Sequence, residues 1–391
     1  MTSDRGGTRA ADVTAFSLHV GDAELEDLRR RLRSARFPEP QPPAPDGSGD
    51  HWTQGVPLDH LRHLVEYWAD GYDWRRTEAE LNLAGQWTTV IGDLDVHFLH
   101  LRSDRTGARP LLLTHGWPGS VAEFLDVAGE LAVPSRPDAP AFHVVAPSLP
   151  GFGFSGKPRT TGWGVARIAD AWATLMERLG YPCFLAHGGD WGGAVATELA
   201  VRHPRRVRAL HTTFPQALPP PDWREEDLDP EEARRWQETR HFWRARTAYA
   251  MQQATRPQTL GYGLVDSPVA LLAWIVDKFH EWTDPRAGPL GGISRDRILD
   301  NVMLYWLGRC GASAARLYWE SYGRLDKNTP VLTPTVVSVF PYEIEKPPRA
   351  WVAARYLAIA DWRTPGRGGH FPGLEVPDVF IEEIRAAFRL P

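Results

Sequence analysis

Cysteine is scarce in this 391-residue chain: only Cys183 and Cys310 occur, far apart and outside any metal-binding or redox motif. This scarcity excludes a disulfide-built scaffold and a cluster of cysteine ligands, and it is typical of a reducing compartment. Long apolar runs are missing as well, because none approaches the roughly 20 residues that cross a bilayer. The polar start of the chain lacks the apolar stretch of a signal peptide. We therefore expect a soluble, cytoplasmic protein with no membrane partner.

Charge of one sign is not concentrated anywhere either. The net charge is −5 and the basic residues are spread along the chain, so we expect no nucleic-acid partner. Arginine outnumbers lysine 40 to 4, which favours a GC-rich bacterial source. Hydrophobic residues make up 42% of the chain, which is enough for a large core. The length admits two or three domains of roughly 100–200 residues each.

Short apolar runs alternate with helical patterns along most of the chain. A hairpin that turns near Gly92-Asp93 precedes this alternation. The apolar runs are typical of strands buried on both faces; they are RPLLLTHG, AFHVVAPS, CFLAHGG, RALHTTF, TPTVVSVF and ARYLAIADW. The alternation predicts an α/β fold in which helices flank a mostly parallel sheet.

The alternation breaks between Pro215 and about Gly323. Three stretches in this region look helical, and no comparable strand lies between them: EEARRWQETRHFWRARTAYAMQQAT, SPVALLAWIVDKFHEW and RDRILDNVMLYWLGRCGASAARLYWESY. We interpret residues 217–323 as a helical lid inserted into an α/β core. That core then comprises residues 86–216 and 324–391.

An aspartate surrounded by glycines follows one of the predicted strands. Residues 187–193 read HGGDWGG, with Asp190 at the centre and a helical pattern after it. A strand, a sharp glycine-lined turn and a helix form the nucleophile elbow of α/β-hydrolases, where the usual G-x-S-x-G carries serine. The alternative is an aspartate that only caps the helix beginning at Trp191.

Two other stretches favour the elbow. HGWPGS ends a predicted strand in a loop of the kind that supplies one backbone N–H to the oxyanion hole of this fold. The two donors would be the backbone N–H groups of Trp117 and Trp191. The stretch RGGHF places His370 after the last strand, as the chain order nucleophile, acid, histidine requires.

The acid of this triad stays open on the residues alone. FPYEIE follows the strand TPTVVSV and offers Glu343 and Glu345, and Asp361 lies closer to His370 in the chain. Each candidate follows or ends a predicted strand, where active-site residues of an open sheet lie. Position therefore does not choose among them.

A carboxylate nucleophile indicates substitution at saturated carbon. Displacement of a leaving group by Asp190 gives an alkyl ester, which water activated by His370 can hydrolyse. The leaving group could be a halide, which needs only N–H donors, or an epoxide oxygen, which needs a proton donor. A tyrosine hydroxyl is a suitable donor.

The chain resembles the epoxide hydrolases of the microsomal type. The resemblance runs from about Phe16 to the end, and its motifs in order are FSLHVGDAELEDLRRRL, YDWR, LN, HFLH, HGWPGS, GFGFS, HGGDWGG, NVMLYW, FPYE and RGGHF. It implies an α/β-hydrolase fold and, in residues 1–85, the N-terminal domain that wraps over the core in this family. The anchor helix of the membrane-bound members is missing, which favours a soluble bacterial relative.

The resemblance also implies a role for each site residue. Asp190 matches the nucleophile, His370 the base, and Glu343 the acid that orients the base. Tyr249, in TAYAMQQATRP, and Tyr318, in ARLYWE, match the two lid tyrosines that protonate the epoxide oxygen. The residues expected to contact substrate are Trp117, Trp191 and Phe371.

We therefore expect an epoxide hydrolase that makes a vicinal diol through an alkyl ester on Asp190. It would use no metal and no organic cofactor, and its substrate would be a small-molecule epoxide, bulky and apolar. Whether it serves detoxification or a biosynthetic pathway, and whether it forms a homodimer, are left open. The alternatives are a haloalkane dehalogenase with the same aspartate elbow and an inactive hydrolase fold that only binds a ligand.

Overall fold

A nine-stranded sheet forms the centre of the computed structural model, which describes residues 13–43 and 52–389. The strand order is β1-β2-β3-β5-β4-β6-β7-β8-β9. Pairing is antiparallel from β1 to β5 and parallel from β5 to β9. The strands are β1 (Thr14–Ala15), β2 (Gln86–Ile91), β3 (Leu94–Leu101), β4 (Arg109–Thr114), β5 (Phe142–Pro147), β6 (Phe184–Gly188), β7 (Val207–Thr212), β8 (Thr335–Ser338) and β9 (Ile359–Arg363).

The six apolar runs predicted as strands are β4 to β9, and the hairpin at Gly92-Asp93 joins β2 to β3. Gly92 has a φ of 62°, which the turn needs and which glycine adopts readily. The expected mostly parallel sheet is thus confirmed. Strands β4 to β8 are mostly buried on both faces, which is why their sequences are continuous rather than alternating, whereas β9 at the edge of the sheet is partly exposed.

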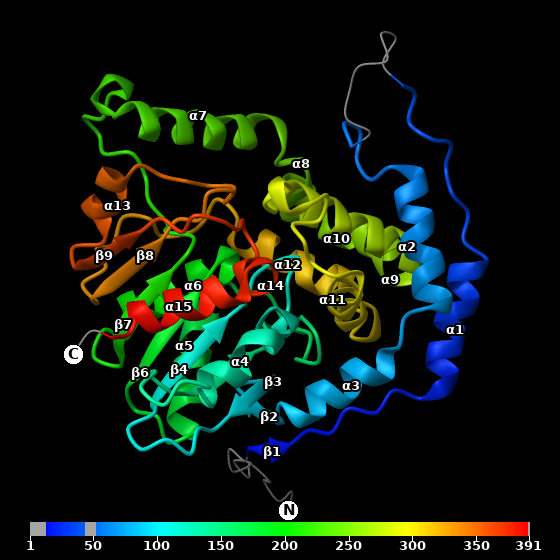
Figure 1. The fold of residues 1–391 in the computed structure, drawn as a ribbon, viewed down its shortest axis with the longest axis horizontal. Helices are drawn as coiled ribbons and strands as arrows, with labels where there is room; N and C mark the ends of the chain where they lie inside the picture. Colours follow the sequence, from blue (N-terminus) through cyan, green and yellow to red (C-terminus); the bar gives the residue numbers. More distant parts are fainter. Residues whose placement is uncertain (1–12, 44–51, 390–391) are drawn as a thin grey trace, which may run out of the picture.

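Helices cover both faces of this sheet (Figure 1). Helix α4 lies beside α15, and α5 lies beside α6. These helices bury apolar side chains against the strands, as their amphipathic patterns require. The helical segments of the core are η1 (Val121–Phe124), α4 (Leu125–Ala132), α5 (Val165–Arg178), α6 (Asp190–Arg202), α13 (Arg349–Arg355), α14 (Pro372–Glu375) and α15 (Pro377–Ala387).

The chain between β7 and β8 is helical, as the sequence predicts, and Figure 1 shows it as a layer beyond one end of the sheet. The first and third predicted stretches are each split into two helices, near Arg246 and near Arg309, which has a φ of 50°. Helix α9 was not predicted, because Gly261 and Gly263 weaken its helical pattern. The segments are η2 (Glu225–Asp227), α7 (Pro230–Ala245), α8 (Ala248–Thr255), α9 (Pro257–Asp266), α10 (Pro268–Trp282), η3 (Pro285–Ala287), α11 (Arg295–Leu307) and α12 (Gly311–Ser321).

Three helices precede the hairpin and run along the side of the molecule (Figure 1): α1 (Asp22–Arg33), α2 (Leu58–Asp70) and α3 (Trp74–Leu83). Helix α1 contacts α10, and α3 contacts α11, so this segment is attached to the inserted helices. The division of the chain into domains at residues 85, 216 and 323 stays a prediction. Among the described residues no single helix is long and apolar enough to span a membrane; α9 and α10 meet that criterion only as a pair bent by 115°.

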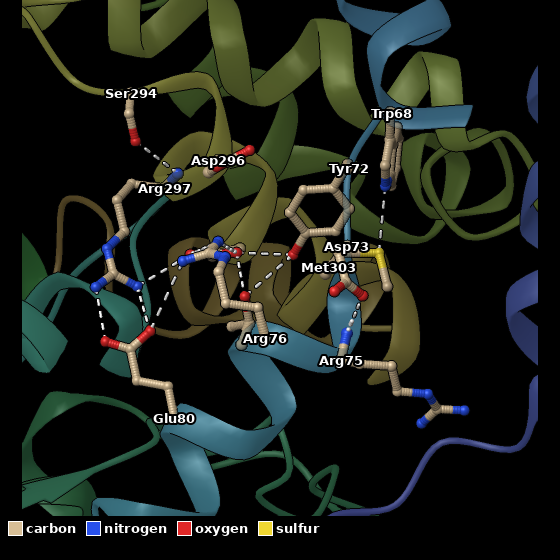
Figure 2. A network of polar contacts seen from close by, with 12 residues as sticks. Trp68, Tyr72, Asp73, Arg75, Arg76, Glu80, Ser294, Asp296, Arg297 and Met303 are labelled. Atoms are coloured by element: carbon tan, nitrogen blue, oxygen red, sulfur yellow. Dashed lines mark hydrogen bonds and ion pairs between the residues drawn. The ribbon is translucent and has the colours of Figure 1, made fainter. Parts of the chain in front are cut away.

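A buried carboxylate joins α3 to α11. Asp300 is fully buried on α11, and its carboxylate accepts hydrogen bonds from Tyr72 (2.7 Å) and Thr77 (2.5 Å). Arg76 lies 2.9 Å and Arg297 3.1 Å from the same carboxylate. Figure 2 shows the side chains of Tyr72, which precedes α3, Arg76 of α3 and Arg297 of α11 converging. Both charge and hydrogen-bonding capacity of Asp300 are therefore satisfied across this contact.

Replacing Asp300 by alanine should lower the free energy of unfolding by about 3 kcal/mol, because it leaves two arginines and two hydroxyls without their common partner. Urea denaturation measures the effect. Asp266→Asn is the matched control: this exposed carboxylate pairs with Arg31 at 3.3 Å, and its change should stay below about 1 kcal/mol. Equal effects of the two substitutions would contradict a structural role for the Asp300 contact.

Candidate active site

The predicted elbow is present where β6 meets α6. Asp190 is the first residue of α6 and has a φ of 49°, a left-handed conformation that non-glycine residues rarely adopt. A Cβ at Gly188 would lie 2.0 Å from the carbonyl oxygen of Gly192, and a Cβ at Gly192 would lie 1.9 Å from that of Thr114. The glycines are thus needed because the backbones of the turn, the helix and β4 meet here.

The Asp190 side chain turns away from its own helix. Its Oδ1 accepts a hydrogen bond from the backbone N–H of Trp117 at 2.8 Å, and the helix has no side-chain N-cap bond. This geometry does not support the helix-cap alternative. The backbone N–H of Trp191 lies in the first turn of α6, where amides have no partner within the helix. Its role as the second oxyanion donor stays a prediction.

His370 lies behind Asp190 and is held by Glu343. The Nε2 atom of His370 is 3.5 Å from Oδ2 of Asp190, and its Nδ1 is 2.5 Å from Oε1 of Glu343. The backbone N–H of His370 donates to the carbonyl of Trp282 at 2.9 Å. The side chains of His370 and Glu343 are almost fully buried. The structure therefore places His370 between the nucleophile candidate Asp190 and the acid candidate Glu343.

The other two acid candidates lie elsewhere. Glu345 accepts a hydrogen bond from the indole N–H of Trp243 at 2.8 Å and lines the large cavity described below. Asp361 is exposed within β9 and pairs with Arg363 at 3.2 Å. Of the three carboxylates, only Glu343 contacts His370.

Charge in this buried site controls the protonation of His370. Burial favours the neutral ring, but the carboxylates of Glu343 and Asp190 outweigh it and raise the pKa of His370 well above its usual value. The imidazolium is therefore favoured while Asp190 is charged. Loss of the Asp190 charge would lower the pKa of His370 and make a neutral base available.

Two tyrosines from the inserted helices complete the site. Tyr249 of α8 and Tyr318 of α12 are buried, with ring centroids 5.9 Å apart. Tyr249 stacks on Trp117 with centroids 5.2 Å apart, and the Tyr318 ring meets the Trp191 ring edge-on with centroids 4.8 Å apart. Burial, together with the charge of Asp190, raises the pKa of both phenols well above the usual value, so both are protonated.

A cavity of about 470 Å³ opens in front of Asp190 and the two tyrosines. Its walls also include Trp191, Phe214, Leu218, Trp243, Tyr322, Leu325 and Ile344, and polar groups from Gln216, Lys327, Asn328 and Glu345. Sequence reasoning did not single out Lys327 as a cavity residue. Glu345 was considered only as a candidate for the triad acid. Its position two residues after Glu343 is the one sequence signal that could have placed it in the cavity.

The two remaining predicted substrate contacts lie deeper. Trp117 and Phe371 are almost fully buried and border a second, small cavity of about 20 Å³ behind Asp190. Phe371 also stacks on Phe279, with centroids 4.5 Å apart. Their contact with substrate stays a prediction. The described residues contain no group of three or more His, Cys, Asp or Glu placed to hold a metal ion.

Comparisons with known proteins place this geometry in a family. The family described as epoxide hydrolase N terminus matches residues 13–124, and the alpha/beta hydrolase fold matches residues 109–252. Epoxide hydrolase 1 of Sus scrofa is 32% identical over 95% of this chain and 88% of its own length. A protein of Stigmatella aurantiaca, provisionally named an epoxide hydrolase, is 46% identical over 96% of this chain and 85% of its own. The chain belongs to the epoxide hydrolase family.

Solved structures of epoxide hydrolases share the whole fold. The juvenile hormone epoxide hydrolase of the silkworm Bombyx mori superimposes with a TM-score of 0.88 at 30% identity, covering 96% of this chain and 94% of that one. The Aspergillus niger epoxide hydrolase gives 0.86 at 33% identity, with 96% and 95% covered. The predicted α/β-hydrolase fold and family resemblance are therefore confirmed. As a member of this family, the chain is an enzyme that hydrolyses ether bonds.

Replacing Gly192 by alanine should lower the free energy of unfolding by about 3 kcal/mol or more, because the new methyl group would collide with the backbone of β4. Thermal and urea unfolding measure this. Gly129→Ala is the control: it lies in α4 with no atom within 4 Å of the new Cβ, and should stabilise the protein by about 0.5–1 kcal/mol. A Gly192→Ala variant as stable as the parent would contradict the close approach at the elbow.

Proposed function

We propose that this enzyme opens an epoxide by covalent catalysis on Asp190. A carboxylate oxygen of Asp190 attacks one epoxide carbon, and the C–O bond of the ring breaks. The freed oxygen takes a proton from the hydroxyl pair of Tyr249 and Tyr318. The product of this step is an ester between Asp190 and the substrate. The observation that carries the proposal is the placement of two buried phenols and the nucleophile in the wall of one cavity.

Hydrolysis of the ester completes the cycle. A water molecule gives a proton to His370 while its oxygen attacks the side-chain carbonyl carbon of Asp190. The negative oxygen of the tetrahedral intermediate would be held by the N–H groups of Trp117 and Trp191. The intermediate then collapses, the bond to the alkyl oxygen breaks, and that oxygen leaves with the proton from His370. The second proton of the water, left on the Asp190 carboxyl group, passes to His370 and restores the charged pair. Glu343 keeps Nδ1 of His370 oriented throughout.

The change of charge at Asp190 supports this order of events. The charge of Asp190 contributes to the raised pKa values of His370, Tyr249 and Tyr318. Esterification neutralises Asp190, so all three pKa values should fall as the first step proceeds. The tyrosines then become stronger acids as the epoxide oxygen needs a proton. His370 loses its proton to replace the one that the tyrosine pair gave up, and it becomes a neutral base when water must be activated.

The two phenols also favour an epoxide over a halide. A halide needs no proton donor on leaving, whereas an epoxide oxygen does, and two protonated phenols stand in the wall of the cavity. An inactive binding protein is disfavoured too, because the nucleophile, base and acid lie within contact of one another.

The cavity sets the substrate class. About 470 Å³ is in the range of small-molecule sites, and the walls nearest Asp190 are aromatic. We therefore propose a bulky epoxide whose apolar part packs on Trp191, Phe214 and Tyr318. We also propose that the enzyme acts in the cytoplasm without a metal or cofactor. The domain boundaries at residues 85, 216 and 323 are part of the same proposal.

Replacing His370 by glutamine should trap the ester. Because alkylation does not need a base but hydrolysis does, Asp190 should gain the mass of the epoxide, while diol formation slows at least about 100-fold. Intact-protein mass spectrometry after incubation with aryl and alkyl epoxides, followed by peptide mapping, measures this. Adding Tyr249→Phe and Tyr318→Phe to the same variant is the control, and it should prevent the adduct. No adduct in His370→Gln, with an epoxide that the parent enzyme turns over, would refute the covalent route.

A further inference from the structure

The small cavity behind Asp190 is separate from the large cavity that opens in front of it. Its volume is about 20 Å³, and Asp190 and His370 both border it. A polar cavity of this size holds about one water molecule if two to four polar groups face it. Asp190 is the residue common to the two cavities. A substrate in the large cavity would therefore meet one face of the carboxylate, and a water in the small cavity would meet another.

Four further polar side chains border the small cavity, and the proposed mechanism uses none of them: Thr114, Glu123, His187 and Thr213. The hydroxyl of Thr114, at the end of β4, is almost fully buried and has no hydrogen-bond partner among the described residues. Glu123, on η1, contributes a carboxyl group, whereas the Nδ1 atom of His187 already pairs with that of His211 at 3.0 Å. An unpartnered buried hydroxyl costs free energy unless water or a ligand binds it. The cavity is thus equipped to hold a polar molecule.

Glu123 is brought close to the nucleophile by two glycines of the HGWPGS loop. A Cβ at Gly119 would lie 1.4 Å from Oε1 of Glu123, and a Cβ at Gly116 would lie 2.3 Å from Oδ1 of Asp190. The same loop donates the Trp117 N–H to Asp190. The loop therefore leaves room for two carboxyl groups, one on each side of the oxyanion donor.

The electrostatic environment fits a carboxyl group that contacts water rather than a salt-bridge partner. Burial raises the pKa of Glu123 to about 8; the charge of His370 acts in the opposite direction, and that of Asp190 adds to the rise. Glu123 is thus neutral at pH 7 beside a charged Asp190. When Asp190 is esterified its contribution disappears, and Glu123 becomes a better hydrogen-bond acceptor.

We propose that the small cavity holds the water that hydrolyses the ester, and that Glu123 and Thr114 position it against His370. One O–H of the water donates to Nε2 of His370 and the other to Glu123. The Thr114 hydroxyl donates to the water oxygen, whose remaining lone pair points at the ester carbon of Asp190. The proton goes to His370, the new C–O bond forms at Asp190, and the alkyl oxygen leaves with that proton. This inference rests on the proposed function, since it concerns its second step.

Stopped-flow and rapid-quench measurements on Glu123→Leu test the inference by separating the two steps. Formation of the Asp190 ester should stay within about twofold of the parent rate, while its hydrolysis should slow at least about tenfold, the factor given by 1.4 kcal/mol. Glu123→Gln retains hydrogen-bonding atoms and should restore hydrolysis to within about threefold of the parent. Thr114→Val, similar in shape, should slow hydrolysis alone and provides an independent variant.

The controls separate the possible failures. Glu198 is a partly buried carboxyl on α6 whose pKa burial also raises, and Glu198→Gln should change neither step. Unchanged ester hydrolysis in both Glu123→Leu and Thr114→Val would overturn the inference. Parallel slowing of both steps with a lower melting temperature would also overturn it, in favour of a structural role. Absence of any Asp190 ester in the parent and in all variants would instead refute the proposed function.

Discussion

The left-handed backbone at Asp190 is the constraint on which the rest of the site depends. Because its φ is 49°, the carboxylate points out of the turn toward the loop at Trp117 instead of capping its own helix. The turn is possible only because glycines let β4, β6 and α6 approach within contact of one another. Every other group of the site is arranged around this carboxylate: His370 behind it, the phenols in front, and the Trp117 N–H beside it.

The same carboxylate couples the acid–base groups electrostatically. Its charge raises the pKa of His370, Tyr249, Tyr318 and Glu123. Conversion to a neutral ester would lower all four values in one step. In the proposed mechanism, the site would change from an acid-assisted alkylation to a base-assisted hydrolysis without a large movement, because neutralising one buried charge changes the protonation preference of each neighbour.

The sequence predicted the sheet well, because strands buried on both faces produce continuous apolar runs, and it predicted the elbow because only glycine fits around Asp190. Spacing alone could not choose among Glu343, Glu345 and Asp361, since all three accompany strands and only the path of the loops decides which one meets His370; the family resemblance pointed to Glu343. Helix α9 was missed because two glycines interrupt its pattern. Glu123 was missed because nothing in VAEF marks it, and its proximity to Asp190 arises only when β4 and β6 pair.

The central claim is that an oxygen of Asp190, and not of water, enters the diol in the first turnover. A single turnover in ¹⁸O-labelled water, with enzyme in excess over an epoxide that it converts, measures this most directly. The account predicts an unlabelled diol and one labelled oxygen in the Asp190 peptide. Labelled diol with an unlabelled Asp190 would contradict it, because water would then have attacked the epoxide carbon directly.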